Sequence, residues 1–201
     1  MSQNLELHLT VAALAESELP RFLETCAKLG ATPILVELSR GAQTQQPMAT
    51  WHVDGQLWSA ANTAREMSKC MAEEGYFVVR TKIEADFDKA KSYENDQVAS
   101  LYYEWHAKLP SELESHVRPL CEAHGAHLSR NALRGQDFRF VTIRETLSAD
   151  EFKNRISMFS AEVTARGWAF ANERSEICLA DDNCSLDAGW LSEQLPAEQD
   201  I

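Results

Sequence analysis

Two short stretches of the chain carry side chains that could do chemistry, and they carry them in the same pattern. Residues 5–11 read Leu-Glu-Leu-His-Leu-Thr-Val, and residues 103–109 read Tyr-Glu-Trp-His-Ala-Lys-Leu. Polar and apolar residues alternate in both, so a strand would bury one face and present glutamate, histidine and a third polar group on the other. Histidine transfers protons near neutral pH, and lysine or threonine can hold an anionic oxygen.

These side chains define the candidate site. His8 and His106 occupy the same place in the two stretches and are the candidate catalytic residues. A later strand at residues 76–85 places further basic side chains on one face. We therefore predict a ligand-binding surface made of the remaining polar residues of these strands: Glu6, Thr10, Arg80, Lys82, Glu104 and Lys108.

The sequence predicts no metal site and no cofactor. Cys121, His124 and His127 lie close together in the chain, but structural zinc needs four well-placed ligands and the fourth is not apparent. Cys121 also has a counterpart in Cys26, four residues before a glycine in each case, which favours packing of both thiols in the core.

The elements that must position the site residues follow the order strand, helix, strand, strand, helix, strand, twice over. Apolar periodicity and the placing of capping residues, glycine and proline predict four helices, at residues 17–30, 57–75, 111–125 and 148–167. Alternating or short apolar runs predict eight strands, at residues 5–11, 34–39, 48–53, 76–85, 101–109, 127–133, 138–145 and 168–179.

This order is typical of the ferredoxin-like fold, an antiparallel sheet with two helices on one face. His8 and His106 lie 98 residues apart and Gly30 and Gly125 lie 95 apart, which indicates an internal duplication. We predict an α+β protein of two tandem ferredoxin-like (βαββαβ) units, residues 1–88 and 101–184, with a polar linker at 89–100 and an acidic C-terminal tail at 185–201. The sequence does not decide whether the two sheets meet edge to edge or stack.

Composition narrows the class of protein. A formal charge of −12 over 201 residues argues against binding to duplex nucleic acid, which depends on neutralising phosphates. No apolar run approaches the roughly 20 residues of a membrane-spanning helix, and no signal peptide is recognisable. Five cysteines, an odd number, favour the reducing cytoplasm. We expect a cytoplasmic protein with no membrane partner, and homo-oligomer formation stays open.

Two resemblances bear on the chemistry. His8-Leu9-Thr10 resembles half of the signature of the 2H phosphoesterases, which implies His8 and His106 as acid and base, with Thr10 and Lys108 binding phosphate oxygens. At the equivalent position, the second half has Lys108 where that family has a hydroxyl residue. Glu104-x-His106-x-Lys108 looks like the Glu-x-Glu-x-Lys strand of the triphosphate-tunnel enzymes, with His106 in place of a metal-binding carboxylate.

The sequence thus predicts a protein that binds a small anionic ligand, phosphorylated molecules included, in a cleft between two units. Phosphoester hydrolysis by the histidines is an extension of that hypothesis. The alternative is a non-catalytic protein-interaction or oligomerisation module whose polar sheet faces a partner covers. Single-stranded RNA binding rests on a basic and aromatic strand at residues 138–144. If His8 and His106 lie in one pocket, the small-ligand hypothesis is favoured over the interaction module.

Overall fold

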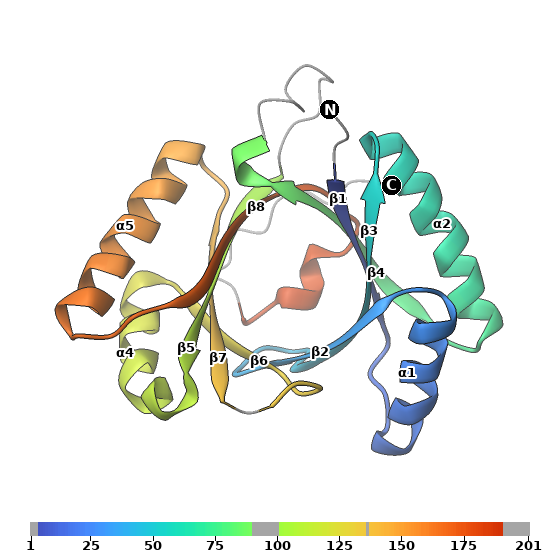
Figure 1. Ribbon diagram of the computed structural model, residues 1–201, viewed down its shortest axis with the longest axis horizontal. Helices are drawn as coiled ribbons and strands as arrows, with labels where there is room; N and C mark the ends of the chain where they lie inside the picture. Colours follow the sequence, from blue (N-terminus) through green and yellow to red (C-terminus); the bar gives the residue numbers. More distant parts are fainter. Residues whose placement is uncertain (1–3, 90–100, 136, 191–201) are drawn as a thin grey trace.

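The computed structural model of the protein describes residues 4–89, 101–135 and 137–190 (Figure 1). Its α-helices are α1 (Leu19–Lys28), α2 (Leu57–Glu73), α4 (Glu114–His124) and α5 (Ala149–Ala165). Its strands are β1 (Asn4–Val11), β2 (Thr32–Leu38), β3 (Gln45–Asp54), β4 (Val78–Asp86), β5 (Tyr102–Pro110), β6 (His127–Asn131), β7 (Phe138–Glu145) and β8 (Ala171–Asp181). Apart from its first residue, the predicted linker at 89–100 lies outside the described residues, as does 191–201 of the predicted tail.

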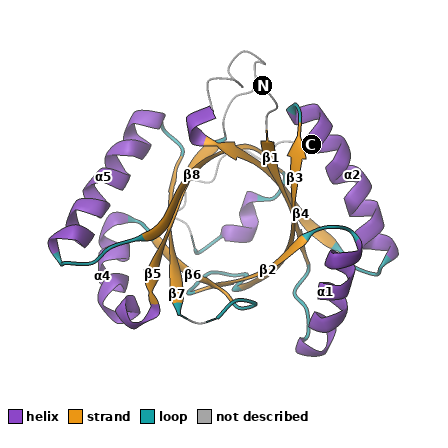
Figure 2. Ribbon diagram, viewed as in Figure 1, coloured by secondary structure: helices purple, strands orange, loops and turns teal. Residues whose placement is uncertain are grey.

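The eight described strands form one closed antiparallel barrel in the order β1-β3-β2-β6-β7-β5-β8-β4. Helices α1 and α2 cover the outside of one half of the ring, and α4 and α5 cover the outside of the other (Figures 1 and 2). Closure satisfies the backbone hydrogen bonds of every strand, because no strand is left as an edge.

The apolar core lies between the barrel and its helices. Leu5, Leu7 and Leu9 of β1 are fully buried against α1 and α2, and a second cluster around Trp105 packs under α4 and α5. Cys26 on α1 and Cys121 on α4 are free and buried, as predicted. Because successive side chains of a strand point to opposite faces, this outward packing directs the polar residues of the same strands into the barrel.

The prediction of two tandem ferredoxin-like units from an internal duplication is wrong. The halves do not form separate sheets with one polar face each, because β2 pairs with β6 and β4 pairs with β8. Both pairings join strands from different halves of the chain, and they close a single ring. Apolar alternation fixes the buried face of a strand, but the backbone groups that pair edge strands carry no such signature.

None of the helices in the described part of the chain has the length and apolar character that crossing a membrane would require.

Candidate functional site

The barrel encloses a cavity of about 410 Å³, which we call the lumen. This volume falls in the range of small-molecule sites, about 300–1,000 Å³. The structure brings all eight predicted site residues together in its lining: Glu6, His8, Thr10, Arg80, Lys82, Glu104, His106 and Lys108. They come from strands β1, β4 and β5, whose inward positions they occupy. Their roles in binding or catalysis stay predictions.

His8 is held firmly by the protein. Its Nδ1 is hydrogen-bonded with the Thr50 hydroxyl at 2.8 Å, and its Nε2 lies 3.0 Å from the Glu84 carboxylate. The residue is buried, with 7% of its surface exposed. Both ring nitrogens are therefore engaged, and His8 offers no free nitrogen to a ligand.

His106 is arranged differently. Its Nδ1 is hydrogen-bonded with the Thr142 hydroxyl at 2.9 Å, but its Nε2 lies 3.5 Å from both Glu104 and Glu176, longer than a good hydrogen bond. The side chain is 29% exposed. Burial would lower the pKa of His106, but the contact with Glu104 and the charges of Glu104, Glu176 and Glu84 outweigh burial and raise the pKa. His106 is thus the histidine that can present a proton to the lumen.

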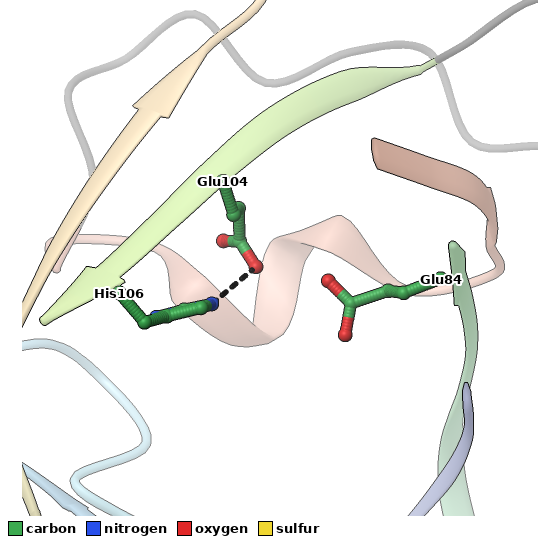
Figure 3. Close-up of side chains that lie close together, drawn as sticks. All are labelled: Glu84, Glu104 and His106. Atoms are coloured by element: carbon green, nitrogen blue, oxygen red, sulfur yellow. Dashed lines mark ion pairs between the residues drawn. The ribbon is translucent and has the colours of Figure 1, made fainter. Parts of the chain in front are cut away.

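Lys82 lies between two buried carboxylates. Its Nζ is 2.5 Å from Glu104 and 2.7 Å from Glu84. Figure 3 shows Glu104 and His106 on β5 and Glu84 reaching toward them from the facing strand. Ligand atoms of Glu84, Glu104 and His106 lie within 4.8 Å of one another, the set among the described residues that could hold a metal ion. The ammonium of Lys82 already supplies a cation to both carboxylates.

Glu176 on β8 is a lumen residue that the sequence did not single out. It is buried, and burial together with the Glu84 charge raises the pKa of Glu176 to about 8. Its neighbours Glu84 and Glu104 carry lowered pKa values, because the charge of Lys82, with that of Arg144 at Glu104, outweighs the cost of burial. At neutral pH the lumen therefore holds ionised and protonated carboxyl groups side by side. The sequence pattern that could have identified Glu176 is the alternation of Arg174 and Glu176 on one face of the last strand.

The C-terminal segment closes one end of the lumen. The 3₁₀-helix η4 (Cys184–Asp187) lies within the ring of strands in Figure 1. Its Asp187 carboxylate lies 3.0 Å from Arg80 and 2.8 Å from Arg144, and it is 2% exposed. Burial would raise the pKa of Asp187, but the charges of Arg144 and Arg80 lower it. No strand periodicity marked Asp187, because it follows the last strand.

The other end of the lumen is open. Arg174, paired there with Glu6, has a side chain that is 49% exposed. Lys108 is half-buried at this end, with its Nζ 5.2 Å from the centre of the Phe140 ring. Among the described residues, Lys108 has no carboxylate within ion-pair distance, whereas every other basic residue of the lining has one. An uncompensated cation thus stands at the open end.

The residues of the remaining hypotheses do not assemble into a site. His124 pairs with Glu162, and His127 contacts Arg40. Burial and the charge of Arg40 lower the pKa of His127 to about 4. Of the basic and aromatic strand, Phe140 and Arg144 line the lumen rather than an outer surface open to an RNA strand.

No protein-family model and no curated protein matches the sequence. Solved structures align over most of the chain at low similarity. They include a "Putative monooxygenase" from Fusobacterium nucleatum subsp. nucleatum, at 9% identity and a TM-score of 0.36, covering 96% of this chain and 99% of that one. The small subunit of acetolactate synthase from Thermotoga maritima aligns at 9% identity and a TM-score of 0.32, covering 88% and 96%. A heme-binding protein from Thermus thermophilus aligns at 11% and 0.30, covering 89% and 92%. At these values the alignments identify no family and no function.

Proposed function

We propose that this protein binds a small anionic molecule, a carboxylate or a phosphate, in the lumen of its barrel. The observation that carries the proposal is Lys108, a cation with no ionic partner among the described residues, on the same strand as His106, whose Nε2 has only long contacts of 3.5 Å with Glu104 and Glu176. An anion placed there would gain charge-assisted hydrogen bonds from both side chains. The two histidines line one cavity, which favours a small ligand over a protein partner.

The charge of the lining supports an anionic ligand. Six lysine and arginine side chains face five glutamate and aspartate side chains, in a protein whose formal charge is −12. Against the effect of burial, the Glu104, Glu176 and Glu84 carboxylates raise the pKa of His106. Burial raises the pKa of Glu176 to about 8, so Glu176 keeps its proton at neutral pH. Arg80 and Arg130 are also paired with Asp181 and Glu37, which lie outside the lining. The positive charge without an ion-pair partner among the described residues therefore lies at Lys108, and a fixed cation of this kind attracts anions.

Arg144 supplies a second argument. Its Nη1 is buried and has no hydrogen-bond partner among the described residues, while the rest of its guanidinium binds Glu104 and Asp187. Buried donors without a partner are rare because they lose their bonds to water. An oxygen of a bound ligand would satisfy this donor.

The test uses inorganic phosphate and acetate as probes, with binding measured by calorimetry on the full chain. Lys108→Met removes the charge and keeps the length of the side chain, and we expect anion affinity to fall at least about tenfold. Lys153→Met is the matched control, because Lys153 also lies over an aromatic ring, that of Phe87, but does not line the lumen. Equal affinity in the wild type and Lys108→Met, or no binding of either probe, would refute the proposal.

Phosphoester hydrolysis is a second candidate, favoured by the Nε2 of His106. In that reaction the oxygen of water would add to phosphorus as the P–O bond to the leaving group breaks, and His106 would give its proton to the leaving oxygen. The proton released by the attacking water would restore the proton of His106. We expect His106→Gln to abolish any hydrolysis of bis(4-nitrophenyl) phosphate or of a 2′,3′-cyclic nucleotide. Hydrolysis that persists in this variant would place the chemistry elsewhere.

A cytoplasmic location is also part of the proposal. The five cysteines are all free, and four of them are buried. Unpaired thiols are typical of proteins kept in a reducing compartment.

A further inference from the structure

One side of the lumen carries apolar residues. Ile34 and Val36 of β2, Met48 of β3 and Phe140 of β7 point into the cavity, and we call these four residues the apolar wall. The opposite side carries most of the charged residues, which come from β1, β4, β5 and β8. The strands on the side of the apolar wall also contribute polar residues to the lining, namely Gln46, Ser129, Arg130, Asn131, Thr142 and Arg144. The apolar wall is therefore the apolar part of a lining that is otherwise mostly polar.

The apolar wall keeps accessible surface. Its four residues are all only partly buried. Outward-facing neighbours on the same strands behave differently, since Leu35 is 6% exposed and Ala49 is 0% exposed. Contact between apolar surface and water is unfavourable, so covering the apolar wall with an apolar group of a ligand lowers the free energy. The wall is thus a surface that a ligand would be stabilised by covering.

The unpaired cation and the apolar wall meet at one place. Lys108 and Phe140 are directly paired residues on the neighbouring strands β5 and β7, and the Lys108 ammonium lies over the Phe140 ring. A molecule whose anionic group binds Lys108 would place its next atoms against Phe140. Strand β6 follows β7 in the ring and contributes Ser129 and Asn131 to the lining. Beyond it, Val36 and Ile34 of β2 face inward, so the body of the molecule would pass β6 to reach them.

We infer that the ligand is an anionic amphiphile, a small molecule with one carboxylate or phosphate head and an aliphatic or aromatic body. The inference rests on the proposed function, because it takes Lys108 as the anion contact. It adds that the body of the ligand contributes to binding by covering the apolar wall. A cavity of about 410 Å³ suits a molecule the size of a short fatty acid or an arylacetic acid.

The first experiment measures the dependence of affinity on chain length. Acetate, butyrate and hexanoate are titrated into the full chain by calorimetry, with hexyl phosphate to compare the two heads and hexan-1-ol as the uncharged analogue. Each buried methylene should raise affinity about three- to fourfold until the wall is covered. Hexan-1-ol should bind far more weakly than hexanoate, since it lacks the charge that Lys108 holds.

A pair of variants places the body of the ligand. Val36→Thr keeps the shape and branching of the side chain and puts a hydroxyl on the apolar wall. We expect it to lower hexanoate affinity several-fold while acetate affinity stays unchanged. Val53→Thr is the control, because Val53 lies on β3, packs against the outer core and does not line the lumen. It should leave both affinities as in the wild type.

The outcomes separate this inference from the proposed function. If acetate, butyrate and hexanoate bind equally well and depend on Lys108, the amphiphile inference is overturned and anion binding stands. If hexan-1-ol binds as tightly as hexanoate, and Lys108→Met changes neither, both are overturned. A rise with chain length that Val36→Thr reduces and Val53→Thr does not would support the inference.

Discussion

Glu176 gives the sharpest test of the electrostatics inside the barrel. Burial and the charge of Glu84 raise its pKa from an ordinary value of 4.5 to about 8. Between about pH 4.5 and pH 8, Glu176 is therefore protonated in the folded protein and ionised in the unfolded chain. The unfolded state binds fewer protons in this window, so stability falls as pH rises through it. Glu176→Gln, which resembles the protonated carboxyl in shape, removes this dependence.

The size of the effect follows from the shift in pKa. Each pKa unit corresponds to about 1.4 kcal/mol. The shift from 4.5 to about 8 therefore corresponds to a loss of about 5 kcal/mol of unfolding free energy above pH 8. Water entering the lumen beside the ionised carboxylate reduces that figure. We expect Glu176→Gln to be about 2 to 5 kcal/mol more stable than the wild type at pH 9, and nearly equal to it at pH 4.5.

The assay is urea unfolding of both proteins at intervals from pH 4.5 to pH 9. The quantity of interest is the difference in unfolding free energy between variant and wild type at each pH, because other titrating groups contribute to both curves. Thermal melts provide a second readout. For a chain of this size each kcal/mol of unfolding free energy shifts the melting temperature by about 2–4 °C, so the variant should melt about 4–20 °C higher at pH 9.

Glu173→Gln is the control, since Glu173 lies on the same strand but is exposed. The unfolding free energy of Glu173→Gln should follow the same pH dependence as that of the wild type. A difference between Glu176→Gln and wild type that stays constant from pH 4.5 to pH 9 would falsify the reasoning, because Glu176 would then ionise at its ordinary pKa. A variant that is less stable at pH 9 would show that the ionised carboxylate is favourable in the lumen.

Three further predictions concern stability and reactivity. His8→Ala should lower the unfolding free energy, measured in urea, by about 1–3 kcal/mol, because it leaves the buried Thr50 and Glu84 without their partner. His106→Ala should lower it by less than about 1 kcal/mol, because His106 is more exposed and its Nε2 contacts are long. Equal losses in the two variants would contradict this prediction. Gly41→Ala should lower the unfolding free energy by about 1–3 kcal/mol, because the φ of Gly41 is +115° and an added Cβ would lie 3.1 Å from the Cβ of Trp190. We also expect faster proteolysis of the C-terminal segment, which contains Trp190. Burial raises the pKa of the Cys26 thiol to about 11 and that of Cys121 to about 12, so a thiol reagent at pH 8 should label both only as fast as the chain unfolds.

The sequence by itself determined which side chains share a face. Alternation along residues 5–11 and 103–109 placed His8 and His106 opposite the apolar residues, and the eight predicted site residues do line one cavity. Period-two alternation is local, and burial of one face enforces it, so it can be read without knowing the fold. The positions of strands and helices followed from the same local signals.

The tertiary structure alone decided that the polar faces enclose a lumen. Ring closure depends on the pairing of β2 with β6 and of β4 with β8, and backbone hydrogen bonds between edges are the same for nearly every residue type. The meeting of Lys82 with Glu104 and of Asp187 with Arg144 likewise depends on that closure, because these partners lie 22 and 43 residues apart. The charge state of Glu176 follows from the desolvation that closure produces, and no pattern along the chain encodes it.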